Sequence, residues 1–346
     1  MDAVPTPREY IRNNEPSSQR LRLLVQLGFL GLNVWIGFLF WRFVSQLEAG
    51  IEPTLGRPAG VEGYLPISAL VSLKYYFDSG EWPLVHPASL VLLLLFVAIA
   101  LLLKKGFCSW FCPVGFLSEY LARLRRFIFR KPFKGVHPAV DWPLRMLKYI
   151  LLYLFVQAIF SAETAKTAAF IAGDYNKVAD IKMMYFFTNL SATAAVVLAV
   201  LVVLSILIPY FWCRYLCPYG GLLGIVSIFS PVTIQRNAQS CIDCRACSKA
   251  CPVLLPVHRM NQVSADECHA CYKCVDACPV QDTLHLRVTG VKKKVPGKVY
   301  ALVIVLFFML ATGAAQLFGY WNSSVTTAEY LELMPRLEEL SHDRGL

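Results

Sequence analysis

The chain has 346 residues, of which 56% are hydrophobic and only 16% are charged, and its mean hydropathy is +0.51. An ordinary soluble domain carries about 25% charged residues. The composition of this chain therefore excludes an ordinary soluble protein and indicates an integral membrane protein with a modest soluble part. The formal net charge of +10 raises the question of nucleic-acid binding, which the placement of the charges decides.

The first twenty residues are polar and lack the short apolar core and small-residue cleavage site of a signal peptide, so we expect a tail. Apolar stretches long enough to cross a bilayer then follow, since about 20 residues are needed. Five such spans are predicted, at 22–43, 85–103, 145–161, 191–211 and 299–319. A weaker run at 64–77 contains Pro66 and Lys74, and we interpret it as an interfacial or re-entrant segment rather than a sixth span.

The charges between these spans are distributed unevenly. Residues 1–22, 104–148 and 212–298 carry 25 basic and 10 acidic residues, whereas 45–84, 162–190 and 320–346 carry 7 and 13. Because basic loops stay in the cytoplasm, the asymmetry predicts an inner-membrane protein with its N-terminus inside and its C-terminus outside. Topology thus explains the basic excess, and we expect no nucleic-acid partner.

Two amphipathic helices are predicted outside the spans. Residues 117–131 place leucines at helical spacing among five basic residues, which is typical of a helix on the anionic inner leaflet. A docking surface for an acidic redox partner is the alternative. Residues 326–340 place apolar residues at helical spacing between glutamates, as expected of an acidic helix on the outer side.

The chain contains an internal repeat. The sequence Cys108-Ser-Trp-Phe-Cys112-Pro-Val-Gly recurs as Cys213-Arg-Tyr-Leu-Cys217-Pro-Tyr-Gly, 105 residues later. Each copy follows a predicted span that runs inward, so both copies should lie at the cytoplasmic face at the same depth. A fixed offset of this kind indicates two related halves.

The strongest chemical signal lies in residues 241–279. Two C-x₂-C-x₂-C-x₃-C-P motifs follow each other, and this spacing is typical of a bacterial two-cluster ferredoxin, in which the fourth cysteine of each motif serves the other cluster. Zinc sites, with ligands in two pairs, and disulfides fit the spacing less well. We therefore predict two 4Fe–4S clusters, one held by Cys241, Cys244, Cys247 and Cys278, the other by Cys268, Cys271, Cys274 and Cys251.

The C-x₃-C-P motifs are less specific. If each pair lies on a helix, the two cysteines share one face and present their thiols together. Three interpretations stay open for these residues: a third iron or iron–sulfur site, thiol or disulfide chemistry, and purely structural cysteines. The residues concerned are Cys108, Cys112, Cys213 and Cys217.

Two C-x₃-C-P motifs after membrane spans, followed by a two-cluster ferredoxin and a last span, resemble the membrane polyferredoxins of the NapH, NosR and CcoG type. The resemblance covers about residues 20 to 320. It implies electron transfer between the quinone pool or cytoplasmic donors and a partner system, often periplasmic. Residues 1–20 leave no room for the flavin-binding domain of NosR-like members, and no C-x-x-C-H haem site is present, so neither cofactor is expected.

The predicted fold is an all-α transmembrane bundle of about five spans with an inserted small α+β two-cluster ferredoxin. Its predicted parts are a cytoplasmic tail (1–20), a membrane domain with four spans and both C-x₃-C-P motifs (21–235), a cytoplasmic ferredoxin (236–290), a last span (291–320) and a periplasmic tail (321–346).

The predicted function is that of an electron-carrier subunit rather than a stand-alone enzyme, with a quinol dehydrogenase, reductase or cytochrome as redox partner. Two rivals are an assembly factor that reduces a metal such as copper during oxidase maturation, and a redox sensor. No nucleophile–base constellation is present, so we expect no catalytic residue. Arg57 and Glu62 are candidates for lining a quinol pocket, and His86 is expected to be structural.

Overall fold

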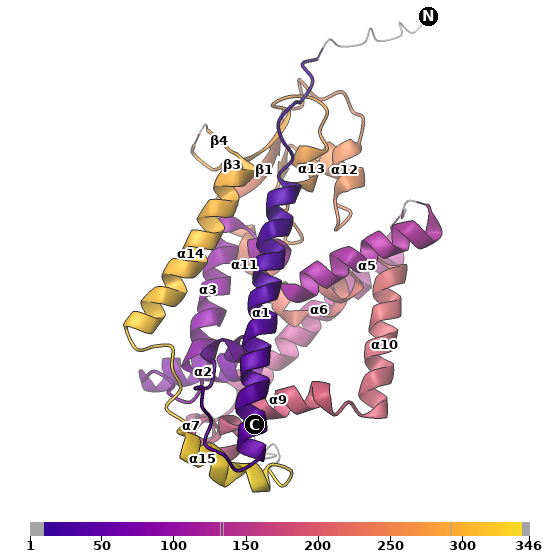
Figure 1. Cartoon of the computed structure of the whole chain (residues 1–346). Coiled ribbons are helices and arrows are strands. Elements are labelled where there is room, and N and C mark those ends of the chain that lie inside the picture. Colours follow the sequence, from indigo (N-terminus) through magenta and orange to yellow (C-terminus); the bar gives the residue numbers. More distant parts are fainter. Residues whose placement is uncertain (1–9, 132, 134, 292, 341–346) are drawn as a thin grey trace, which may run out of the picture. The chain divides into compact units, whose positions relative to one another are not determined.

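The computed structural model of the chain describes residues 10–131, 133, 135–291 and 293–340. The described residues are mostly helical, with one small sheet (Figure 1). They divide into two compact units. The first unit consists of Met1–Gly28, Ala98–Trp142 and Leu204–Val305, and the second of Phe29–Val97, Pro143–Val203 and Leu306–Leu346. Five helices continue from one unit into the other, namely α1 (Gln19–Glu48), α3 (Pro87–Leu103), α6 (Pro138–Phe160), α10 (Ala192–Leu207) and α14 (Gly297–Leu317).

The first unit contains short helices and the sheet. Its helices are α4 (Gly106–Trp110), α5 (Pro113–Phe129), the π-helical turn η2 (Trp212–Leu216), α11 (Pro218–Ile228), α12 (Ala246–Ala250), the 3₁₀ turn η3 (Val257–Arg259) and α13 (Lys273–Asp276). Its strands are β1 (Val232–Arg236), β2 (Gln262–Val263), β3 (Leu284–Val288) and β4 (Lys294–Val295). The predicted boundary of the ferredoxin at residue 236 falls at the end of β1, and β4 follows the predicted end at 290.

The sheet is antiparallel throughout, with strand order β2-β1-β3-β4. In the register, Ile234 of β1 lies opposite both Leu286 of β3 and Val263 of β2. All three side chains are buried. Because side chains alternate between the two faces of a strand, this register places one apolar face of the sheet against the cysteine-bearing loops.

The polypeptide before α1 packs against the ferredoxin-like part of the first unit. Arg12 forms an isolated antiparallel bridge with Val280, and the start of α1 is tied to Asp276 of α13. The Asp276 carboxylate accepts hydrogen bonds from Ser18 N at 3.1 Å and from Gln19 Nε2 at 2.7 Å. The part of the predicted tail that the structure describes is therefore attached to this unit, while residues 1–9 lie outside the described residues.

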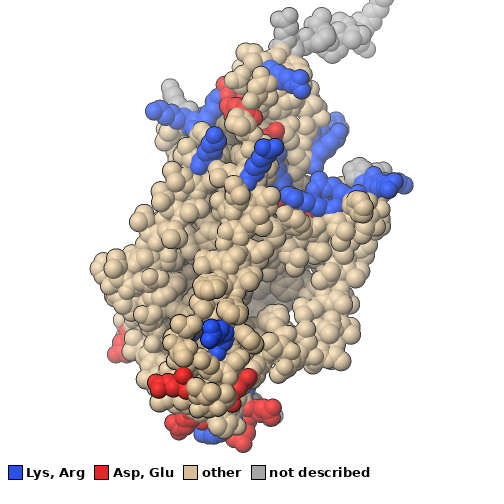
Figure 2. Space-filling model, viewed as in Figure 1, with Lys and Arg blue, Asp and Glu red and all other residues tan. Residues whose placement is uncertain are grey.

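The second unit contains the remaining helical segments, η1 (Ala59–Tyr64), α2 (Pro66–Ser79), α7 (Thr164–Ala172), α8 (Asp174–Lys177), α9 (Ala179–Thr188), α15 (Thr327–Leu333) and η4 (Met334–Arg336). Phe43 of α1 packs edge-on against Tyr330 of α15, with ring centroids 5.6 Å apart. Leu333 and Leu337 join the same buried cluster. The apolar side of the acidic C-terminal segment thus belongs to a core, and its acidic side chains are visible as red atoms around α15 in Figure 2.

The C-terminal segment is not one helix over 326–340. The helix α15 ends at Leu333 and the short turn η4 follows, with Pro335 inside it. Proline has no backbone N–H for the helical hydrogen bond and its ring clashes with the preceding turn, so it ends the helix early. At the other end, Thr326 and Glu329 form a capping box that fixes the start of α15.

Within the described residues, three helices are long and apolar enough to cross a bilayer, α1, α6 and α14. They coincide with the first, third and fifth predicted spans. The fourth predicted span corresponds to α10, which follows α9 at a bend of 76°, and the second to α3, an apolar helix of 17 residues. The chain is thus a largely helical membrane protein with a ferredoxin-like part.

Candidate iron–sulfur sites

The two C-x₂-C-x₂-C-x₃-C motifs fold in matching ways, each as a loop that leads into a short helix, α12 or α13, carrying the third cysteine. At the second position after the first cysteine, Asp243 and Ala270 both have positive φ, at 51° and 48°. Two residues further on, Arg245 and Tyr272 do the same, at 59° and 60°. Since non-glycine residues rarely adopt this left-handed conformation, its recurrence shows that both loops wind in the same way around an interior space.

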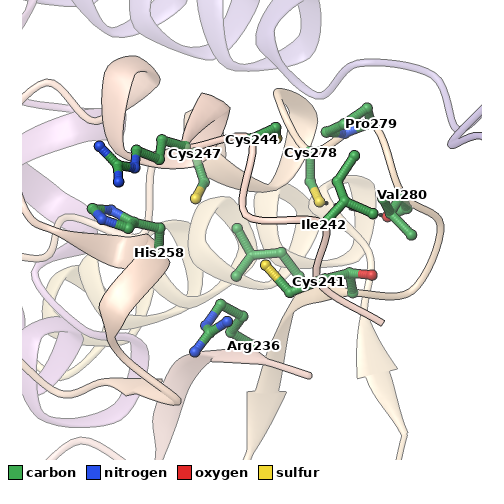
Figure 3. A pocket seen from close by; sticks show the side chains of 12 residues that line it. Arg236, Cys241, Ile242, Cys244, Cys247, His258, Cys278, Pro279 and Val280 are labelled. Carbon is green, nitrogen blue, oxygen red and sulfur yellow. Dashed lines mark hydrogen bonds between the residues drawn. The ribbon is translucent and has the colours of Figure 1, made fainter. Parts of the chain in front are cut away.

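The first interior space is lined by the cysteines of two motifs. Cys241, Cys244 and Cys247 come from the first motif, and Cys278 comes from the end of the second. The pocket has an empty volume of about 350 Å³. Figure 3 shows the sulfur atoms of Cys241, Cys247 and Cys278 pointing toward one common space. Cys244 is exposed, so this pocket lies near the surface of the unit.

The second interior space has the complementary set of cysteines. Its walls carry Cys268, Cys271 and Cys274 of the second motif and Cys251 of the first, around an empty volume of about 370 Å³. Ile234 of the sheet also lines it, and three of its four cysteines are buried. Because burial and solvent exposure set cluster potentials, the two pockets offer different environments to the same chemistry.

In the C-x₃-C-P motifs, the two cysteines of a pair do not lie on one helix. Cys108 lies in α4 and Cys213 in η2, but each of these helices ends before the second cysteine. Cys112 and Cys217 have extended backbones and act as N-caps of α5 and α11. The two cysteines of each pair therefore lie on either side of a helix break, because the proline after the second cysteine begins a new helix at its N1 position.

The glycine of each repeat copy explains this local geometry. The backbone N–H of Gly115 donates to Cys112 Sγ at 3.5 Å, and that of Gly220 donates to Cys217 Sγ at 3.2 Å. A Cβ atom at Gly115 would lie 2.1 Å from the carbonyl oxygen of Cys108. Both glycines could have been identified from the sequence, since they occupy the same position in the two copies of the repeat.

The four thiols of the two copies influence one another. Burial raises the pKa of the Cys213 thiol to about 12, and the neighbouring Cys217 and Cys108 contribute in the same direction. Ser118 Oγ, 3.4 Å from Cys213 Sγ, opposes this shift. Without a bound metal, Cys213 therefore keeps its thiol proton at neutral pH, and metal binding must displace that proton.

Both repeat copies are hydrogen-bonded to the wall of the second pocket. In the first copy, Ser109 Oγ donates to the carbonyl of His269 at 2.7 Å, and Trp110 Nε1 donates to that of Ala270 at 3.2 Å. In the second copy, Arg214 Nη1 donates to the carbonyl of Val253 at 2.6 Å. Ser109 and Arg214 occupy the same repeat position, directly after the first cysteine. These hydrogen bonds therefore attach both copies of the repeat to the loops that surround the more buried pocket.

A buried ion cluster lies beside this contact. The Glu119 carboxylate accepts two hydrogen bonds from Arg22, both at 2.8 Å, and pairs with Lys273 at 3.0 Å. Burial alone would raise the pKa of Glu119, but the Lys273 and Arg22 cations outweigh it and lower the pKa to about 2. The same residues line a small pocket whose walls also include Cys108 and Cys271. Sequence reasoning missed this cluster, although Glu119 is the only acid in the basic helix α5.

The other candidates lie in the second unit. Arg57 pairs with Glu62 at 2.7 Å and with Asp180 at 2.5 Å, and His86 Nε2 lies 2.6 Å from the carbonyl oxygen of Asn176. These side chains are almost completely buried. Arg57 and Glu62 therefore stabilise the interior of this unit, as His86 was expected to do.

All twelve cysteines are free of disulfide bonds. Among the described residues, no three or more histidine, cysteine, aspartate or glutamate side chains converge closely enough to hold a single metal ion. The two pockets instead spread their thiols around a larger volume, which fits a multi-iron cluster better than one tetrahedral zinc ion.

Comparison with known proteins agrees with this chemistry. A family model described as a 4Fe-4S binding domain matches residues 85–132 and 190–233, the two repeat copies with their preceding helices. A model described as a 4Fe-4S dicluster domain matches residues 233–279. No solved structure matches the chain.

Curated relatives extend the match to most of the chain. The putative electron transport protein YccM of Escherichia coli is 40% identical over 328 residues, covering 93% of this chain and 91% of YccM. The regulatory protein NosR of Pseudomonas aeruginosa is 29% identical over 72% of this chain and 39% of its own length. The ferredoxin-type protein NapH of Haemophilus influenzae is 27% identical over 62% of this chain and 75% of NapH. The chain belongs to the family of ferredoxin-type membrane electron-transport proteins that includes these relatives.

Proposed function

We propose that this protein carries single electrons from its cytoplasmic face toward the membrane, between the quinone pool or a cytoplasmic donor and a partner redox system. The observation that carries the proposal is the sorting of eight cysteines into two pockets, each built from three cysteines of one motif and the proline-flanked cysteine of the other. Bound 4Fe–4S clusters supply one-electron redox chemistry with little change of geometry.

The eight cysteines would hold the two clusters in different environments. Cys241, Cys244, Cys247 and Cys278 hold the cluster nearer the surface, where a soluble donor has access. Cys268, Cys271, Cys274 and Cys251 hold the more buried one. Because Cys251 and Cys278 each bind across to the other motif, the two clusters are held close together, within reach of an electron hop.

A third iron–sulfur centre at Cys108, Cys112, Cys213 and Cys217 extends the route. Two features support it. The match to a 4Fe-4S binding model falls on both repeat copies. The hydrogen bonds from Ser109 and Trp110 to His269 and Ala270 join the loop of Cys108 directly to the loop of Cys271. Such contacts hold the second pocket and the repeat at a fixed separation.

In the membrane, we propose five spans at α1, α3, α6, α10 and α14, with the ferredoxin part in the cytoplasm, the N-terminus inside and the C-terminus outside. The distribution of basic residues supports this orientation. A quinol dehydrogenase, a reductase or a cytochrome is the expected partner class.

Iron counting tests the proposal. The protein is purified anaerobically in detergent, iron and sulfide are measured per chain, and the reduced protein is examined by EPR. We expect about twelve irons in the parent and about eight in a variant with Cys108, Cys112, Cys213 and Cys217 changed to serine. Cys247→Ser is the matched change in a ferredoxin motif and should remove a different EPR signal.

The outcomes separate the parts of the proposal. About eight irons in both proteins would confine the redox centres to the two pockets and remove the third centre. A carefully anaerobic preparation without clusters would overturn the function itself.

A further inference from the structure

The first pocket carries basic side chains along one side. Arg236, Arg245 and His258 line it together with its four cysteines. Figure 3 shows Arg236 and His258 to the left of and below the sulfur atoms. Cys244 is the exposed member of the four cysteines, so its sulfur is where this site meets the solvent. A protein that exchanges electrons with this site must therefore approach at a rim that carries cations.

The two cysteine motifs use their equivalent positions in opposite ways. The offset between the motifs relates Arg245 to Tyr272 and Lys249 to Asp276. Arg245 and Tyr272 share the left-handed backbone conformation, but Arg245 is exposed and Tyr272 is buried. Lys249 is exposed, whereas Asp276 accepts hydrogen bonds from the start of α1. The second motif uses these two positions inside the unit, and the first motif presents them to solvent.

A third exposed cation is held beside these two. The turn η3 is attached to α12, because Ser248 Oγ lies 2.8 Å from His258 Nδ1 and accepts a hydrogen bond from the His258 backbone N–H at 3.0 Å. Arg259 follows His258 directly and is exposed. The backbone N–H of Lys249 donates to the carbonyl of Arg245 at 3.1 Å, so these two residues share the first turn of α12. Three exposed cations thus come from two segments that are joined directly.

The positive charge on this side has no counterpart in the chain. Residues 236–260 carry four basic residues and one acidic residue, whereas residues 261–290 carry two basic and four acidic residues. Both stretches lie on the same predicted side of the membrane, so topology alone does not account for the difference. Among the described residues, none of Arg245, Lys249 and Arg259 forms an ion pair. Such an uncompensated group of cations attracts and orients an anionic partner.

The opposite side of the first pocket is apolar. Figure 3 places Ile242, Pro279 and Val280 to the right of the sulfur atoms. Ile242 and Val280 also line a neighbouring hollow together with Tyr10 and Ile11, which are 50% and 73% exposed. Protein interfaces combine an apolar centre with a polar or charged rim, and the surface around this pocket offers both.

We propose that Arg245, Lys249 and Arg259 form the docking surface for a soluble, acidic one-electron carrier protein that reduces the cluster of the first pocket. The inference rests on the electron-carrier role in the proposed function and adds the chemistry of the donor. One electron leaves the carrier, which is oxidised by one unit, and enters the cluster, which is reduced by one unit. No bond or proton changes place. Carboxylates around the carrier's redox centre pair with the three cations and speed the encounter.

Stopped-flow kinetics on the purified, full-length protein with its clusters test this. The probe is an acidic flavodoxin reduced to its hydroquinone, and its oxidation to the semiquinone is followed by absorbance. With Arg245, Lys249 and Arg259 changed to glutamine, we expect the second-order rate constant to fall about tenfold or more. The parent rate should fall as salt is added, and the rate of the variant should depend less on salt.

Two controls separate docking from other effects of the substitutions. A matched variant replaces three exposed cations of the same unit that do not line the first pocket, and it should keep the parent rate. These are Arg126→Gln, Lys293→Gln and Lys298→Gln. Reduced methyl viologen, a small donor that needs no docking surface, should reduce the docking variant as fast as it reduces the parent. Equal slowing with viologen would mean that the cluster itself is damaged, and the salt dependence of the parent then decides.

Several results would overturn the inference. A parent rate that does not depend on salt would refute it without any variant. An unchanged rate in the docking variant with its full iron content would refute the docking surface and leave the proposed function intact. Equal slowing in the matched variant would show that net charge alone is responsible. A rate lost only in nanodiscs that contain anionic lipid would show that the bilayer occupies this surface. A parent protein without clusters would remove the proposed function itself.

Discussion

Gly115 and Gly220 occupy the same position in the two repeat copies, but their surroundings differ. A Cβ atom at Gly115 would lie 2.1 Å from the Cys108 carbonyl oxygen, whereas at Gly220 the nearest atoms lie 3.5 Å away. Alanine is a better helix former than glycine by about 1 kcal/mol, so Gly220→Ala should be neutral or stabilising. Gly115→Ala should destabilise the protein by about 1–3 kcal/mol, because the backbone around Cys108 must move.

Thermal unfolding and iron content of the two variants check this pair. Gly115→Ala should lose iron from the repeat and Gly220→Ala should keep it. Equal stability and equal iron content of the two variants would contradict the inferred difference in backbone packing.

Glu119 is held between Arg22 and Lys273, and its pKa of about 2 lies below the ordinary value of 4.5. The folded pKa is the lower one, so the carboxylate adds stability at all pH values above about 4.5, and this stability is lost as the pH falls toward 2. Glu119→Gln removes the negative charge that pairs with the buried Arg22 and the partly exposed Lys273, and it should cost about 3–5 kcal/mol at neutral pH.

Denaturant unfolding at a series of pH values measures this effect. The difference between Glu119→Gln and the parent should be largest above pH 4.5 and shrink below it. A difference that is independent of pH would show that lost packing, and not charge, is responsible.

At the scale of elements, the sequence predicted those features that a local pattern of residues encodes. The alternation of apolar runs located the helices α1, α6 and α14, and the cysteine spacing located the two matching loops. The i, i+4 spacing of Cys108 and Cys112 left open whether the pair shares a helix, and in the structure Pro113 starts a new helix directly after Cys112. The Arg22–Glu119–Lys273 cluster joins three distant segments, and no local pattern reports such a contact.

The attachment of the N-terminal segment to α13 is likewise a long-range feature that can be tested. Asp276 accepts hydrogen bonds from Ser17, Ser18 and Gln19 at the start of α1. Asp276→Ala removes this cap and should cost about 1 kcal/mol. Hydrogen exchange of residues 11–19 should rise, while α14 serves as an internal reference. Unchanged exchange would mean that the Arg12–Val280 bridge alone holds the segment.

At the scale of the whole molecule, the charge asymmetry predicts the orientation. Because 25 of the 33 basic residues lie on one predicted side, that side should remain in the cytoplasm. Alkaline phosphatase, which is active only outside the inner membrane, should be active when fused at the C-terminus and inactive when inserted at Gly290. Activity at Gly290 would place the ferredoxin part outside and reverse the proposed direction of electron flow.

The two units also differ in what stabilises them. All twelve cysteines lie in the first unit, and eight of them line the two pockets, whereas the buried clusters around Phe43 and Ile171 lie in the second unit. Because metal binding to a small domain contributes directly to its folding free energy, removal of iron should open residues 241–278 and leave the second unit protected.

Hydrogen exchange before and after treatment with ferricyanide and EDTA measures this. We expect loss of protection in β1 and β3 and little change at Phe43, Ile171 and Tyr330. Restoring iron and sulfide should return the protection, because each pocket takes its cysteines from both motifs and a bound cluster would tie the two loops together. Equal loss of protection in both units would instead show that the clusters stabilise the whole chain as one cooperative structure.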